Sequence, residues 1–285
     1  MRVAIGVDWS DQAFTAVTQT FQLYHPMDVT LVHGVNLGLF EQPIIAEATN
    51  LQGYHDFRNA MVDAGRQLLD RTAAMIPSDV KTVRKVNEIG SPAKVILDSA
   101  QTVSADLVVV GARGRSRVAE TVLGSVSHRV LSHASRPTLI VKGEAHPIQR
   151  VLVAVEGRDD ADQIVGWLTR HRFANPVELC VLNAVVPIGL DSPYDALGAK
   201  AWWEGVESYA KEFIKETAAK LLYSQYTVST KVAVGNPSAV VEEQANGADL
   251  VVVASHGRKG LARFLLGSVS HAIVHQVTCP VLIIR

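Results

Sequence analysis

Four small residues in the first half of the chain have a spacing that suits phosphate binding. Gly111 and Gly114 follow an apolar run, and Gly124 and Ser125 come later, at the start of a predicted helix. Glycine lets the backbone come close to a ligand, and the free N–H groups and positive dipole end of a helix start attract anions. The pattern Gly-x2-Gly-x9-Gly-Ser therefore predicts that phosphate groups bind between Gly111 and Val126.

Charged side chains near these glycines extend the same chemistry. Arg113 and Arg117 lie in the loop and offer paired N–H donors to polyphosphate oxygens. Asp8 follows a separate apolar run, and its carboxylate is of the kind that accepts hydrogen bonds from ribose hydroxyls in other nucleotide sites. Together these residues indicate an anionic ligand of the nucleotide class.

Each of these residues also has a purely structural interpretation. The glycines are typical of tight turns, Asp8 and Ser125 are residue types that cap helices, and arginines are common in solvated loops. Since no single residue decides between the two interpretations, the prediction rests on their combined spacing.

The elements that would position these residues alternate regularly. Apolar runs rich in Val and Ile predict strands, helical spacing fills the gaps, and strands without polar alternation are typical of a parallel sheet covered on both faces. This order predicts a doubly wound (Rossmann-like) α/β domain that binds its ligand outside the carboxyl ends of the strands. The expected strands of the first half are 3–7, 29–35, 80–88, 107–110 and 138–141, and the expected helices are 11–23, 57–75, 92–103 and 122–133.

The same pattern occurs twice in the 285 residues. The pentapeptide Gly-Ser-Val-Ser-His at Gly124–His128 returns unchanged at Gly267–His271, an offset of 143 residues. A repeat of this length is a whole domain rather than a solenoid unit. We therefore expect two tandem domains, residues 1–143 and 149–285, each a five-stranded parallel sheet flanked by four helices.

The second copy departs from the first at two site positions. Ala254 stands where the first copy has Gly111, and Glu156 stands where it has Asp8. A Cβ at position 254 resists positive φ and close backbone approach, and Glu is longer by one methylene. We expect the second site to keep its phosphate-binding part but to bind the same ligand class more weakly or with another base preference. The retained residues are Gly257, Gly267, Ser268 and Val269.

In combination these motifs resemble the universal stress protein family. The resemblance rests on the glycine signature, on Val-Asp-x-Ser after the first strand, on Leu31-Val32-His33 and on a closing Pro-Thr/Val-Leu-Ile strand, and it covers both halves. Similarity to the ATP-binding branch implies that adenine lies near the ends of the first two strands, beside Gly6 and Gly34. It also implies ribose at Asp8, phosphates on the glycine loop, a divalent ion such as Mg²⁺ or Mn²⁺, and pairing of two chains into a homodimer.

Composition excludes several other classes of protein. With 27 Lys+Arg against 28 Asp+Glu and a net charge of −1, the chain lacks the global attraction for nucleic acid or an anionic membrane that a basic domain has. No apolar run approaches the ~18 residues of a membrane span. Cys180 and Cys279 stand in apolar sequence, so we expect buried thiols in a reduced, cytoplasmic protein.

The most specific function that these patterns support is a nucleotide-dependent stress-response regulator without substantial turnover. The sequence has no Gly-x-Gly-x-x-Gly, Walker A or Gly-x-Ser-x-Gly motif, and we expect structural or surface roles for its scattered histidines, His128 and His271 included. Two alternatives remain open. One is a slow ATP-hydrolysing or adenylate-forming enzyme, and the other is an interaction scaffold that binds no nucleotide.

Overall fold

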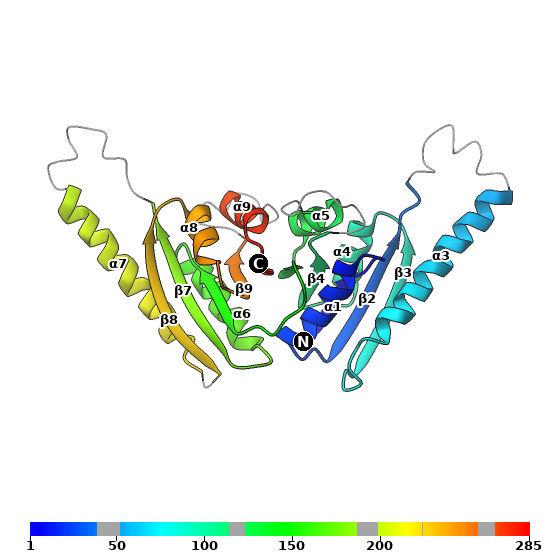
Figure 1. Cartoon of the computed structure of the whole chain (residues 1–285), viewed down its shortest axis with the longest axis horizontal. Coiled ribbons are helices and arrows are strands. Elements are labelled where there is room, and N and C mark those ends of the chain that lie inside the picture. The colour runs from blue at the N-terminus through cyan, green and yellow to red at the C-terminus, as the bar shows by residue number, and fades with distance from the viewer. Residues whose placement is uncertain (39–51, 114–122, 187–198, 224, 256–265) are drawn as a thin grey trace. The chain divides into compact units, whose positions relative to one another are not determined.

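The chain folds into two compact units, Met1–Ala145 and His146–Arg285. The computed structural model describes residues 1–38, 52–113, 123–186, 199–223, 225–255 and 266–285 (Figure 1). Within these residues each unit contains five strands and four helices, so the predicted doubly wound α/β fold is confirmed.

The first unit has a parallel sheet with the strand order β3-β2-β1-β4-β5. The inner strands are buried along nearly their whole length because helices cover both faces, whereas the edge strand β3 is largely exposed. The strands are β1 (Arg2–Gly6), β2 (Asp28–Val35), β3 (Thr82–Ile89), β4 (Leu107–Gly111) and β5 (Thr138–Val141).

Helices lie on both faces of this sheet (Figure 1). The chain moves outward from β1 to β3 and then crosses back to β4 and β5, so right-handed connections place the first two helices on one face and the last two on the other. The reversal leaves a crevice outside the carboxyl ends of β1 and β4, where such sheets bind ligands. The helices are α1 (Asp11–Leu23), α3 (Gln52–Ala73), α4 (Pro92–Thr102) and α5 (Ser125–His133).

The second unit repeats the topology, with the strand order β8-β7-β6-β9-β10 and parallel pairing. Its strands are β6 (Arg150–Ala154), β7 (Val177–Val185), β8 (Tyr226–Val234), β9 (Leu250–Ala254) and β10 (Val281–Ile284). Its helices are α6 (Arg158–Arg170), α7 (Ala199–Ala219), α8 (Pro237–Gln244) and α9 (Ser268–Gln276).

Element boundaries differ from expectation where polar backbone contacts decide them. The strand expected from residue 80 begins at Thr82 because the Val80 N–H donates to the carbonyl of Pro77 in a turn (3.2 Å). The helix expected from residue 122 begins at Ser125 because Gly124 is extended (φ −64°, ψ 154°) and forms the N-cap. The helix at 11–23 begins and ends as predicted.

Two further expectations concern the environment of the protein. No helix among the described residues is long and apolar enough to cross a membrane. Cys180 and Cys279 are free thiols, but both are only half-buried, so the expectation of buried thiols was wrong. Cys180 shares a face of β7 with exposed Glu178, and Cys279 lies in the turn before β10 rather than in the strand.

Candidate functional site

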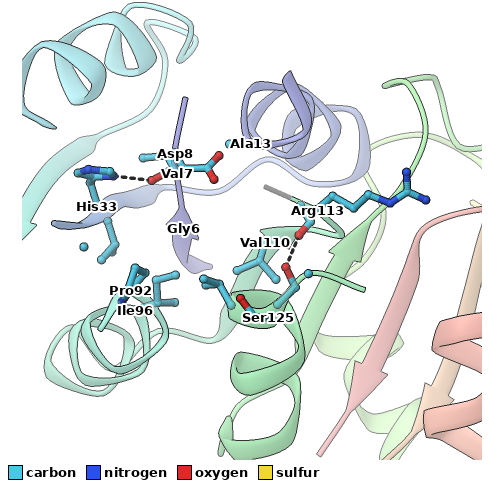
Figure 2. A pocket seen from close by; sticks show the side chains of 16 residues that line it. Gly6, Val7, Asp8, Ala13, His33, Pro92, Ile96, Val110, Arg113 and Ser125 are labelled. Carbon is cyan, nitrogen blue, oxygen red and sulfur yellow. Dashed lines mark hydrogen bonds between the residues drawn. The ribbon is translucent and has the colours of Figure 1, made fainter. Parts of the chain in front are cut away.

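A cavity of about 220 Å³ opens at the carboxyl ends of β1, β2 and β4 and at the start of α5 (Figure 2). Most of the residues predicted for the first site line it, although they come from four separate parts of the sequence. Gly114 and Arg117 lie outside the described residues. The predicted residues in the lining are Gly6, Asp8, Gly34, Gly111, Arg113, Gly124, Ser125 and Val126.

Asp8 lies in the turn between β1 and α1. Its Oδ1 accepts hydrogen bonds from the N–H (3.0 Å) and the hydroxyl of Ser10, and no described residue donates to its Oδ2. Ser10, not Asp8, caps α1, since its Oγ accepts from the N–H of Ala13 (3.2 Å). The helix-capping interpretation of Asp8 is therefore wrong, and its second oxygen is available to a ligand in the cavity.

The start of α5 presents backbone donors to the same cavity. Gly124 is the N-cap, so Ser125 is the first helical residue rather than the cap. The first bond within the helix runs from the N–H of His128 to the carbonyl of Gly124 (2.8 Å), which leaves the N–H groups of residues 125–127 without intrahelical partners. Three backbone donors at the positive end of a helix dipole suit a phosphate group.

Two hydrogen bonds fix this helix start against the end of β4. The hydroxyl of Ser127 donates to the carbonyl of Gly111 (2.6 Å), and the N–H of Gly124 donates to the carbonyl of Ala112 (2.7 Å). Ser127 is buried and lines the cavity, yet the sequence reasoning passed over it. The available signal was its presence in both copies of the Gly-Ser-Val-Ser-His motif.

His33 forms another wall, at the end of β2. Its Nδ1 lies 2.9 Å from the carbonyl oxygen of Val7. Since a carbonyl only accepts, Nδ1 carries the proton, and in the neutral ring Nε2 is an acceptor. Figure 2 shows this bond beside the Asp8 carboxylate.

Apolar side chains complete the cavity and were missed by the sequence reasoning. They lie in or just after the buried strands, in the first turn of α1 and in the first two turns of α4, where strand and helix patterns indicate core rather than site. Such walls suit the flat faces of a base. These residues are Val7, Ala13, Val32, Pro92, Ile96 and Val110.

Three of the predicted glycines pack closely against other elements. A Cβ at Gly34 would lie 2.6 Å from the Cα of Pro92 in α4. A Cβ at Gly6 would lie 2.5 Å from Cδ1 of Ile96, and a Cβ at Gly111 would lie 2.8 Å from the carbonyl oxygen of Gln12 in α1. A contact with a flexible methyl can be relieved, but a contact with helix backbone requires movement of the helix. The glycine at 111 is thus explained by the approach of α1, whether or not a ligand binds.

Arg113 contributes to the lining with its backbone. Its carbonyl lies 3.5 Å from the Ser10 hydroxyl, and Figure 2 shows its guanidinium extended away from Asp8 and Ser125. The predicted contact with phosphate therefore needs another rotamer of Arg113.

The second unit keeps the helix-start geometry. Gly267 is the N-cap of α9 and Ser268 its first residue, with Val269 partly exposed beside it. The hydroxyl of Ser270 donates to the carbonyl of Ala254 (2.7 Å), which repeats the Ser127 bond of the first unit. Gly257 lies outside the described residues.

The nucleoside end of the second unit is built differently. Three residues separate β6 from α6, whereas four separate β1 from α1. Asp160 closes the shorter turn by accepting from the N–H groups of Glu156 and Gly157 (2.7 Å each), and the Glu156 side chain is exposed. Burial raises the pKa of the Asp160 carboxyl, although these backbone hydrogen bonds oppose the shift. The carboxylate of this turn thus serves the fold, which sequence reasoning did not foresee.

Strand register exposes a further difference between the copies. Pairing of β1 with β2 and of β6 with β7 aligns Gly6 with Ala154 and Gly34 with Ala184. With Ala254 at the position of Gly111, alanine replaces glycine at all three strand ends of the second unit.

Comparison with known proteins gives one consistent result. The sequence profile of the universal stress protein family matches residues 1–142 and again residues 147–285. A universal stress protein of Mycolicibacterium smegmatis is 28% identical over 295 aligned positions, covering 99% of this chain and 96% of the relative. Another, from Mycobacterium tuberculosis, is 26% identical over 303 positions with the same coverage.

A solved structure agrees at the level of fold. The crystal structure of a universal stress protein from Archaeoglobus fulgidus superposes with a TM-score of 0.65 at 16% identity, covering 100% of this chain and 96% of that one. At this identity the likeness concerns the arrangement of strands and helices and not the ligand.

Proposed function

The chain belongs to the universal stress protein family in both of its halves, and from this premise we propose that its first domain binds an adenine nucleotide, in the first place ATP. One observation carries the proposal: a single cavity joins the Asp8 carboxylate, apolar walls and the free N–H groups at the start of α5. Carboxylate, apolar surface and helix start match ribose, base and phosphate in turn.

The size and donor set of the cavity fit a nucleotide with its phosphates directed along α5. About 220 Å³ is below the ~300–1,000 Å³ of pockets for drug-sized ligands, so the described walls hold the nucleoside part rather than the whole molecule. Asp8 is the one carboxylate in that lining. A Mg²⁺ or Mn²⁺ ion would therefore be held mainly by phosphate oxygens and water, as is usual for Mg²⁺.

We propose that the output is a change of conformation or partner and not substantial turnover. The titratable side chains in the described lining are Asp8, His33 and Arg113. Asp8 is engaged with Ser10, and the proton of His33 with Val7. Among the described residues neither is hydrogen-bonded to a second titratable side chain, so this lining lacks the paired acid and base that general acid–base catalysis uses.

Isothermal titration calorimetry tests the assignment of Asp8. Asp8→Ala should weaken the binding of ATP at least about tenfold, since a hydrogen bond to a charged group contributes ~1.5–3 kcal/mol. Asp11→Ala, which removes an exposed carboxylate from the first turn of α1, is the matched control. Tripolyphosphate, which has no ribose, should bind Asp8→Ala and the unaltered chain alike. Equal ATP affinity in all three proteins would contradict the proposal.

Mass spectrometry of the small molecules released on denaturation separates the three functional alternatives. Retained ATP supports a binding protein, ATP converted to ADP or AMP over time supports an enzyme, and no nucleotide together with a flat titration supports the scaffold.

Pairing of two chains and a cytoplasmic location belong to the same proposal. The location is supported by the two cysteine thiols, which are not joined in a disulfide. Analytical ultracentrifugation with and without ATP measures the pairing, and cell fractionation measures the location.

A further inference from the structure

Helix α9 of the second unit carries two histidines one turn apart. The ring centroids of His271 and His275 are 4.6 Å apart, with 39° between the ring planes. Their ligand nitrogens lie within 4.8 Å of one another, and both side chains are half-buried. The Nε2 atom of His275 is itself buried. The pair belongs to one short helix, and its geometry therefore depends on that helix alone.

Residues four apart on a helix lie on the same face, and two histidines at this spacing are a recurrent zinc-binding arrangement. Two nitrogens bound to Zn²⁺ at 2.0–2.1 Å with a tetrahedral angle lie about 3.3 Å apart. Because the nitrogens of this pair are already within 4.8 Å, side-chain rotation that closes at most about 1.5 Å is enough to reach this separation.

The position of the pair on the helix also favours a cation. His275 lies in the last turn of α9, where the helix dipole is negative. The phosphate-facing residues of the same helix begin at Ser268, so His275 lies at the opposite end of α9, whereas His271 follows three residues after Ser268. His275 is thus separated from the helix start by most of the length of α9.

The first domain offers a natural comparison. Its last helix has His128 and Ser132 at the matching positions, so the two-histidine spacing occurs on α9 and not on α5. A metal site on α9 would therefore belong to the second copy alone, while the Gly-Ser-Val-Ser-His helix start is the same in both copies.

We propose that His271 and His275 form a binding site for a divalent transition metal of borderline softness, Zn²⁺ or Ni²⁺, with water at the remaining positions. Imidazole is a ligand that both ions prefer, while Mg²⁺ and Ca²⁺ prefer oxygen. The second domain would then respond to metal as the first responds to nucleotide.

Titration of the full chain with Zn²⁺ and with Ni²⁺, in the absence of nucleotide, tests the site. His271→Ala and His275→Ala should each weaken binding at least about tenfold, because a single imidazole cannot chelate. His55→Ala, which removes an exposed histidine from α3, should bind as the unaltered chain does. Mg²⁺ should give no signal. Equal affinity in all four proteins would overturn the proposal.

Chemical mapping of the unaltered chain makes the test independent of folding defects in the variants. Zn²⁺ should block carbethoxylation of His271 and His275, measured by peptide mass spectrometry, and leave His55 reactive. Unchanged modification of the α9 peptide at saturating Zn²⁺, or uniform loss at all ten histidines, would reject the site.

Discussion

The hydroxyl of Ser127 donates a 2.6 Å hydrogen bond to the carbonyl oxygen of Gly111. This bond joins the start of α5 to the end of β4, so the three backbone N–H groups that face the cavity are held against a rigid strand. Ser270 and Ala254 repeat the arrangement at 2.7 Å in the second domain.

Ser127→Ala should destabilise the first domain by about 1–3 kcal/mol, because a buried carbonyl loses its donor. It should also weaken the binding of tripolyphosphate more than the binding of adenosine, since only the helix start is loosened. Urea denaturation and calorimetry measure the two effects. Ser132→Ala is the control, because Ser132 is only half-buried and its hydroxyl donates to the carbonyl of His128 within α5. A loss of adenosine affinity as large as that of tripolyphosphate would count against this role.

Gly111→Ala should destabilise the first domain by about 1–3 kcal/mol because the new methyl meets the backbone of Gln12 in α1. Gly53→Ala should instead stabilise the first domain. Position 53 lies in α3 with nothing within 4 Å of a Cβ, and alanine is favoured over glycine in a helix by up to ~1 kcal/mol. The urea denaturation midpoints of the two variants, compared with that of the unaltered chain, measure these effects. An unchanged midpoint for Gly111→Ala would show that α1 moves to accommodate the methyl group without cost.

Asp160→Asn should lower stability at neutral pH by about 1 kcal/mol, since one amide oxygen cannot accept both N–H groups that the carboxylate accepts. The pH dependence follows from the raised pKa of Asp160. The folded state then holds this proton more tightly than the unfolded state, so the contribution of Asp160 to stability is largest below the ordinary pKa and falls as pH rises through the raised one.

Urea denaturation of both proteins between pH 7 and about pH 4 should therefore show that the unaltered chain exceeds Asp160→Asn in free energy of unfolding by an amount that grows as pH falls. Asp159→Asn, an exposed neighbour in the same turn, should show no such trend. An advantage that shrinks toward acid would mean that the carboxylate is favoured in the folded state.

ATP should slow amide hydrogen exchange at residues 125–127 strongly and at residues 268–270 weakly. Both helix starts present free N–H groups, but the second domain lacks the Asp8 contact. Exchange followed by mass spectrometry with and without ATP measures this, and equal protection of the two segments would show that the nucleoside end contributes little to affinity.

The sequence supports the fold and part of the site because local chemistry determines both. Buried apolar strands specify the sheet order, and Asp8 and the glycine signature fall at strand ends where that order brings them together. Packing contacts between distant segments cannot be predicted from the sequence. That Gln12 is the reason for Gly111, or that Asp160 takes over the turn of the second domain, depends on distances between segments far apart in the sequence. The sequence contains His271 and His275 four residues apart, but only the helix shows that both rings lie on one side of it.

The three glycines of the first domain and the three alanines of the second imply linked evolution of neighbouring positions. A Cβ at Gly6 would lie 2.5 Å from Cδ1 of Ile96, and in the second domain Ala154 and the shorter Val241 stand at the sequence positions that match Gly6 and Ile96. Across relatives, a residue larger than glycine at the end of the first strand should accompany a side chain shorter than isoleucine in the first turns of α4. Where that exchange has occurred, the added methyl group would narrow the cavity, so a loss of nucleotide affinity could begin with a substitution that never touches the ligand.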